Sequence, residues 1–230
     1  MLWITHYLKL DGSIDLVGES QLLQKKYGYY DDYPINHNYI TSQFNESILD
    51  ATSLGFIERD QQGQGNLYNY DFRSSPVDNF GNQLYNDYDT STYTIKGVMF
   101  DGIGVNSSQV PKPINFINSS NDGSATTHPI QIATRWLYTS RHYDWKRINP
   151  TSFIKIAEGF TLKGSLDPFI QDPTPTQNFI FKGKPNNGSY NNLSVGGNWN
   201  SYLVGNPYPS ALDTDQFIID NKGILHGAVY

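Results

Sequence analysis

The stretch Leu8-Lys-Leu-Asp-Gly-Ser-Ile-Asp-Leu16 decides how the chain begins to fold, because all of its apolar residues occupy even positions. Its Asp11-Gly12 dipeptide ordinarily predicts a two-residue hairpin turn. A hairpin would put the apolar residues after the turn on the face opposite those before it, since successive side chains of a strand alternate. A run that stays extended keeps them on one side, and Leu22 continues the same parity. The pattern therefore favours the coiling rungs of a short β-solenoid, with a long extended edge strand as the alternative.

The residues that follow interrupt this pattern. Residues 25–50 are polar, aromatic and rich in turn-forming types, which predicts an inserted loop. Apolar residues return in Leu54-Gly-Phe-Ile57 and give way to the polar run Glu58-Arg-Asp-Gln-Gln-Gly63. We therefore expect solenoid-like rungs over residues 1–58, with the loop at 25–50, and a second domain over residues 59–230.

The second domain has the sequence pattern of an all-β sandwich. Short runs rich in β-branched and aromatic residues recur, and turn dipeptides such as Asp101-Gly102 separate them. The predicted fold is a jelly-roll-like β-sandwich, with candidate strands at 67–72, 92–100, 130–138, 153–157, 160–163, 178–182, 193–195, 200–204 and 224–230. In the strand at 130–138, the even-numbered residues from Ile130 to Tyr138 are expected to share one face.

Two local features stand out near the end of the chain. A short helix is expected near 212–220, because Ser210-Ala-Leu-Asp213 has the spacing of a capping box and Asp213-Thr-Asp-Gln216 repeats it. Its buried stripe would consist of Leu212, Phe217 and Ile218. Asn206-Pro-Tyr-Pro-Ser210 must end a strand, since its prolines remove two hydrogen-bond donors, and we expect a cis bond at Tyr208–Pro209.

The composition limits the function. The 230 residues include no cysteine, and their formal net charge is -6. Disulfides and cysteine-based metal or nucleophile sites are therefore impossible. The 22 Asn and 17 Tyr residues favour turns and strands over helices. An acidic chain repels nucleic acid, and no apolar run reaches the length of about 18 residues that a membrane-spanning helix needs.

Three tryptophans are the candidate ligand-binding residues: Trp136, Trp145 and Trp199. Their flat rings would stack on sugars if they lay exposed in a coplanar row with Asn or Asp nearby, which would indicate a carbohydrate-binding surface. A glycoside hydrolase would need two carboxyl groups about 5–9 Å apart, and the acids to examine are Glu58, with Asp60 close by in sequence, and Glu158. The histidines lack metal-ligand spacing, so no metal site or cofactor is predicted. Asp- and Asn-rich segments leave structural calcium open at three places: Asp87-Tyr-Asp89, Asp11 with Asp15, and Asn121-Asp122-Gly123.

Six phrases carry a family resemblance when they are taken together in this order. They are Leu16-Val-Gly-Glu-Ser-Gln-Leu22, Ile57-Glu-Arg-Asp-Gln-Gln-Gly63, Tyr70-Asp-Phe-Arg-Ser-Ser-Pro-Val77, Ala157-Glu-Gly-Phe-Thr-Leu-Lys-Gly164, Phe179-Ile-Phe-Lys-Gly-Lys-Pro-Asn-Asn-Gly188 and Tyr202-Leu-Val-Gly-Asn-Pro-Tyr-Pro-Ser-Ala-Leu-Asp213. The chain resembles a region of large exported proteins of Bacteroidetes, especially flavobacteria, upstream of a type IX secretion C-terminal sorting domain. The resemblance implies a β-rich, multidomain, secreted or cell-surface protein, and it implies no catalytic residues. The relatives usually carry Trp where this chain has Phe72.

These observations lead to an expectation of function. We expect a non-catalytic structural or adhesive module of a secreted or cell-surface protein, not an enzyme. The alternatives are a carbohydrate-binding sandwich and, further off, an accessory or catalytic fragment of a glycoside hydrolase. The expected partners are other domains of the same longer chain and polysaccharide. Because no secretion signal opens the chain and it stops within a predicted strand, we expect it to be a piece of a longer protein.

Overall fold

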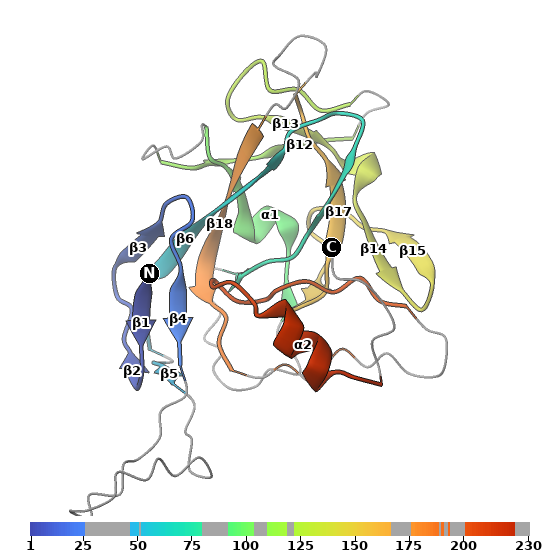
Figure 1. The fold of residues 1–230 in the computed structure, drawn as a ribbon. Helices are drawn as coiled ribbons and strands as arrows, with labels where there is room; N and C mark the ends of the chain where they lie inside the picture. Colours follow the sequence, from blue (N-terminus) through green and yellow to red (C-terminus); the bar gives the residue numbers. More distant parts are fainter. Residues whose placement is uncertain are drawn as a thin grey trace, which may run out of the picture.

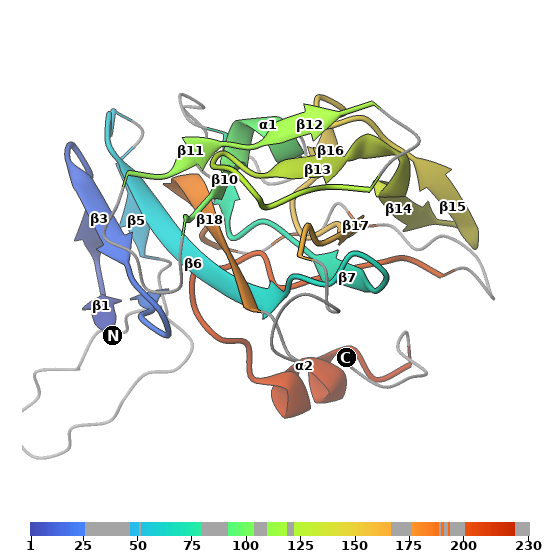
Figure 2. The same ribbon diagram turned by 90° about the horizontal axis from the view of Figure 1, so that it is seen from above.

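A computed structural model describes residues 1–25, 47–50, 52–79, 92–103, 110–118, 122–166, 176–188, 190, 193 and 201–223. Strands dominate these residues and form several open sheets, so the expected all-β, sandwich-like fold is confirmed. Figures 1 and 2 show the first strands grouped at one side of the molecule and the remaining sheets beside them. Trp199 and the predicted strand at 224–230 lie outside the described residues, as do most of the strand at 193–195 and of the predicted loop at 25–50.

The first six strands form two stacked coils. We call β1 (Leu2–Ile4), β2 (Tyr7–Leu8) and β3 (Ser13–Leu16) the first rung, and β4 (Leu22–Gln24), β5 (Ile48–Leu49) and β6 (Phe56–Gln64) the second rung. Each strand pairs in parallel with the strand at the same place in the other rung: β1 with β4, β2 with β5 and β3 with β6. Parallel stacking of successive coils is the pairing of a β-solenoid, and it excludes a hairpin at Asp11-Gly12.

Strand β6 also belongs to the largest sheet. It pairs antiparallel with β18 (Thr176–Pro185), and the order in this large sheet is β11-β10-β18-β6-β3. The other members are β10 (Met99–Asp101), β11 (Lys112–Pro113) and β8 (Val77–Asp78), which pairs with the end of β18. The boundary expected between residues 58 and 59 falls inside β6, so one continuous strand runs from the second rung into the sandwich (Figure 1).

A second, smaller sheet lies across the core from β18. Its order is β15-β14-β17-β7, with β7 at Tyr70–Arg73, β14 at Tyr138–Arg141, β15 at Asp144–Arg147 and β17 at Phe160–Lys163. Two short pairs complete the strands: β12 (Asn115–Ile117) parallel to β13 (Gln131–Ala133), and β9 (Thr92–Tyr93) antiparallel to β16 (Ile154–Lys155).

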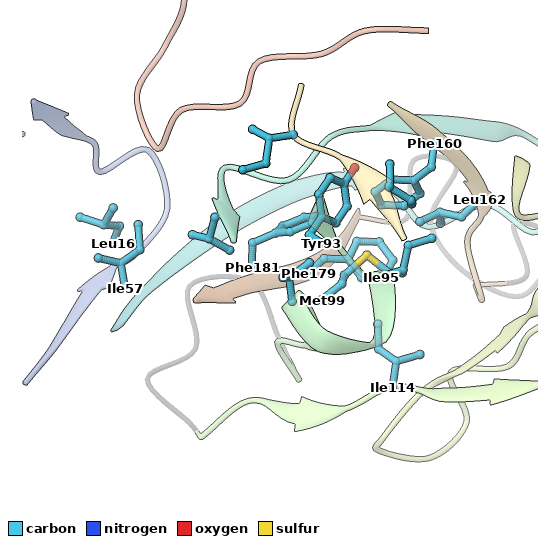
Figure 3. Close-up of a cluster of buried hydrophobic side chains, with 14 of the residues drawn as sticks. Leu16, Ile57, Tyr93, Ile95, Met99, Ile114, Phe160, Leu162, Phe179 and Phe181 are labelled. Carbon is cyan, nitrogen blue, oxygen red and sulfur yellow. The ribbon is translucent and has the colours of Figure 1, made fainter. Parts of the chain in front are cut away.

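Aromatic side chains from both sheets form the core, as Figure 3 shows. Phe179 and Phe181 of β18 are fully buried, and so are Phe160 of β17 and Tyr93 of β9. The rings of Tyr93 and Phe160 lie 6.4 Å apart between centroids. Side chains of this size contribute the most apolar burial per residue, so they hold the two sheets together.

Two α-helices occur in the described residues, and both have side-chain caps. In α1 (Ile95–Val98), the hydroxyl of Thr94 accepts a hydrogen bond from the amide of Gly97 at 3.1 Å. In α2 (Thr214–Asp220), the carboxylate of Asp213 accepts one from the amide of Gln216 at 3.0 Å. Helix α2 confirms the helix expected near 212–220.

Four local expectations are wrong. Helix α1 interrupts the predicted strand at 92–100, and a 3-10 turn at Thr134–Trp136 breaks the strand at 130–138, so its even residues do not share one face. Helix α2 has no buried residue and therefore no buried stripe. The cis peptide bond among the described residues is His128–Pro129, and Tyr208–Pro209 is trans.

The core predicts the outcome of one pair of substitutions. Phe181→Ala removes a fully buried ring and should lower the free energy of unfolding by about 3–5 kcal/mol. Phe153→Ala, at a ring that is 72% exposed, should change it by less than about 0.5 kcal/mol. Urea unfolding of both variants measures the difference, and similar losses in the two would contradict this description of the core.

Candidate functional site

The first rung presents an open strand edge. Among the described strands, β1, β2 and β3 each pair on one side only, with the second rung. The backbone amides and carbonyls of a strand alternate between its two sides. About half of the backbone groups in these strands therefore point away from the second rung, toward the side where the described chain offers no strand.

Three apolar side chains of the first rung are more exposed than their register partners in the second rung, whereas Leu10 and Leu16 of the first rung are buried. Leu2 is 41% exposed, whereas its register partner Leu22 is 1% exposed. Ile14 and Leu8 are half-buried, while their partners Ile57 and Leu49 are buried. The difference arises because, within the described residues, the second rung has neighbours on both sides and the first rung has a neighbour on one side.

The far side of the second rung is closed by the sandwich. Strand β18 pairs with β6, the Leu22 amide donates to the Pro209 carbonyl at 3.2 Å, and the Ala211 amide donates to the Gln21 side chain at 3.0 Å. Two side chains at the end of β18 and just after it also donate hydrogen bonds to the second rung. The Lys184 amine donates to the Ser53 carbonyl, and the Asn187 side-chain amide donates to the Ser47 carbonyl. All three strands of the second rung, or the residues beside them, are thus held by the sandwich.

Comparison with known proteins gives no match. No family model, no curated protein and no solved structure is similar to this chain. The case for any site therefore depends on its geometry.

The two predicted ligand-binding tryptophans that the structure describes, Trp136 and Trp145, contact different aromatic rings. Trp145 on β15 is 54% exposed, and its ring lies 6.4 Å from that of Phe72 with 50° between the planes. The ring of Trp136 instead meets Tyr70 edge-on. Trp136 also has Lys163 at 3.8 Å and Arg135 at 4.5 Å from its ring centroid, so cations occupy its surface. Sequence reasoning missed Phe72, which is 61% exposed, because exposure cannot be read from a short strand pattern.

Glu158 is built into the core. Its two carboxylate oxygens accept hydrogen bonds from Arg141 at 2.5 and 2.7 Å, and the Thr139 hydroxyl adds another at 2.7 Å. These hydrogen bonds raise the pKa of Arg141, the main opposing effect being its partial burial. A fully buried carboxylate with both oxygens engaged in this way joins β14 to the turn before β17 and offers no open face to a substrate.

The other acids meet at the junction of the rungs. Asp15 of β3 lies opposite Glu58 of β6 in the parallel register. Desolvation, followed by the charges of Glu58 and Asp60, raises the pKa of Asp15. Glu58 pairs with Lys182 at 2.9 Å, and Asp60 accepts a hydrogen bond from the Gly18 amide at 2.9 Å. No group of three potential metal ligands occurs among the described residues, and the candidate calcium turn Asp87-Tyr-Asp89 lies outside them.

The proximity of Asp15 to Glu58 predicts that removing the Asp15 charge stabilises the folded protein in a pH-dependent way. Because its pKa is raised in the folded protein, ionised Asp15 lowers stability once the pH exceeds that pKa. Asp15→Asn should therefore raise the free energy of unfolding at neutral pH, by a few tenths of a kcal/mol, and the gain should vanish as the pH falls through the range where Asp15 is protonated. Urea unfolding across that range measures it.

A matched control is Asp144→Asn. Asp144 is an exposed acid on β15 that faces Arg141 in the register, so its neutralisation removes no repulsion. It should give no stabilisation at any pH. A neutral-pH loss of stability in Asp15→Asn, or the same gain in both variants, would contradict the repulsion between Asp15 and Glu58.

Proposed function

We propose that this chain is a non-catalytic structural module in which a β-sandwich closes one end of a β-solenoid. The observation that carries the proposal is the covering of the second rung: strand β18, Pro209 and the side chains of Lys184 and Asn187 all bind its backbone. The first rung has no such cover among the described residues. The part of the chain that the structure describes therefore has one closed and one open solenoid end.

Closing a solenoid end has a clear physical benefit. An uncovered rung presents unpaired amides and carbonyls that pair with any other strand edge, which leads to aggregation. Lys184 is well suited to cover such an edge, since its buried amine satisfies a carbonyl and its charge resists the addition of another strand. Burial lowers the pKa of this amine.

The setting of the module is part of the proposal. The resemblance to exported proteins of Bacteroidetes supports a secreted or cell-surface protein whose other domains are the partners of this module. No helix among the described residues is long and apolar enough to cross a membrane. A role in adhesion would follow if the solenoid holds a neighbouring domain away from the cell.

Removing one covering contact tests the proposal. Lys184→Met keeps the length of the side chain and removes the donor to Ser53. Amide exchange in β4 and β5 should become about tenfold faster, while exchange in β17 stays unchanged, because only the second rung loses cover. Sedimentation should also show self-association. NMR measures the amide exchange residue by residue, and sedimentation measures the self-association.

Lys96→Met is the control, since Lys96 is exposed on α1, away from the rungs. It should change neither exchange nor association. If Lys184→Met instead accelerates exchange equally in all strands, the residue supports overall stability and not the closing of a rung.

Glycan binding is a second candidate function, favoured by one observation. Trp145 and Phe72 are each more than half exposed and lie in contact on the outward face of the small sheet. Exposed, neighbouring rings supply stacking surface for sugars.

Affinity electrophoresis against a panel of polysaccharides tests this candidate. Any retention should fall at least about tenfold in Trp145→Ala and persist in Phe153→Ala, which removes an exposed ring elsewhere. The absence of retention on every polysaccharide, or an equal loss in both variants, would contradict it.

A further inference from the structure

Gly12 and Gly55 occupy equivalent corners, just before β3 in the first rung and just before β6 in the second. They differ in the atoms that a Cβ on each would meet. The Gly55 amide donates to the Leu10 carbonyl at 2.6 Å, and the next amide, of Phe56, donates to the Gly12 carbonyl at 3.1 Å. A Cβ placed on Gly55 would overlap the carbonyl oxygen of Gly12. The close stacking of the first rung on the second thus requires glycine at position 55.

Gly12 is the corner residue at the other end of the stack. A Cβ placed on Gly12 would meet no atom within 4 Å, and its φ is not in the left-handed region. Neither the packing of the described chain nor the backbone conformation calls for glycine there. A further rung stacked at the same spacing would call for it, because Gly12 would then stand in the place that Gly55 occupies now.

Three independent features therefore point to the same open side. The strand edges of the first rung are unpaired within the described structure, its interior residues Leu2, Leu8 and Ile14 are partly uncovered, and Gly12 has empty space over it. Between the two existing rungs all three features have their counterpart. The strand edges are paired, the leucine and isoleucine side chains stack on each other, and Gly55 lies against the backbone of the first rung. The interface between the first and second rungs therefore serves as the model for an interface between the first rung and a further rung.

We infer that the first rung is a docking edge for another parallel rung, supplied by a β-solenoid segment of the same polypeptide. This inference rests on the proposed function, in which the sandwich closes the side of the second rung and leaves the first rung as the end that another rung can reach. The partner is defined by its chemistry. It has three short strands that pair in parallel with β1, β2 and β3, apolar side chains over Leu2, Leu8 and Ile14, and a cation over Asp15, since Asp15 already faces Glu58.

Covalent attachment is the favoured source of this rung. A single coil of three short strands buries too little surface to stay folded alone, and binding from solution would add a large loss of translational and rotational entropy. A rung on the same chain avoids that loss, because its effective concentration is high.

The experiment extends the full chain by one rung. A copy of residues 1–20 is placed before Met1, so that its strands precede β1, β2 and β3 at the spacing that separates Leu2 from Leu22. The copy carries Asp15→Lys to place a cation over Asp15. We expect amides in β1 and β3 that exchange rapidly in the 230-residue protein to become at least about tenfold more protected in the extended protein.

Gly12→Ala at the original position separates docking from general stability. It should leave exchange unchanged in the 230-residue protein, where Gly12 has open space, and abolish the new protection in the extended protein, where its Cβ would meet the added backbone. As a second control, an added copy that also carries Leu8→Asp and Ile14→Asp should give no protection.

Three results would overturn the inference. They are the absence of new protection in the extended protein, an equal effect of Gly12→Ala in both proteins, and self-association of the 230-residue protein that Gly12→Ala abolishes, since the last result would make a second copy the occupant. Failure of the proposed function is distinguishable from these, because Lys184→Met reports on the second rung, on the opposite side of the stack.

Discussion

The structure depends on the pairing of β6 along both of its edges. Residues at the start of this strand pair in parallel with β3 and antiparallel with β18 at the same time. Arg59, for example, is opposite Leu16 on one side and opposite Phe181 on the other. The solenoid and the sandwich thus share one strand, and the twist and register of one are fixed by the other. A flexible linker between them would leave their orientation undefined.

Polar side chains complete the junction where strand pairing ends. Asn186 donates to the carbonyls of Ser75 and Pro207, while Asn206 accepts from the Tyr208 amide and donates to the Ser210 carbonyl. The Tyr208 hydroxyl donates to the Gly188 carbonyl at 2.6 Å. Backbone groups without a partner are costly when buried, and two prolines in this segment remove donors that could have formed a ladder. Asparagine side chains supply the missing partners, which explains in part why the chain is so rich in this residue.

The sequence predicted the parts of the fold that rest on local patterns. The parity of Leu8 to Leu16 correctly favoured coiling rungs over a hairpin, because side-chain alternation along a strand is a local property. The capping residue Asp213 likewise located α2. The full length of β6 was not predictable, since Glu58 to Gly63 is polar throughout and shows no alternation, and its pairing partner β18 lies far away in sequence. The 3-10 turn at Thr134–Trp136 has no sequence signal and moved Trp136 out of the expected face.

The candidate site was even less visible in the sequence. An open edge is defined by which strands lack neighbours, and a closed one by contacts such as Lys184 with Ser53, which link residues far apart in the chain. Aromatic residues drew attention to carbohydrate binding, yet their rings are tilted or covered by cations. The role of Gly12 became visible only through its comparison with Gly55 in the next rung.

Amide exchange within β6 tests the shared strand most directly. The Phe56 amide donates toward the first rung, so the amides of Glu58 and Asp60 point the same way, and those of Ile57 and Arg59 point toward β18. In this parallel register the amides of Glu58 and Asp60 face the carbonyls of Ile14 and Leu16, so both should be as strongly protected as those of Ile57 and Arg59. The Gln64 amide lies on the same edge of β6, beyond the end of β3, and should exchange faster. Exchange of Glu58 and Asp60 as fast as that of Gln64 would show that β6 is paired on one edge alone, which would contradict the union of solenoid and sandwich.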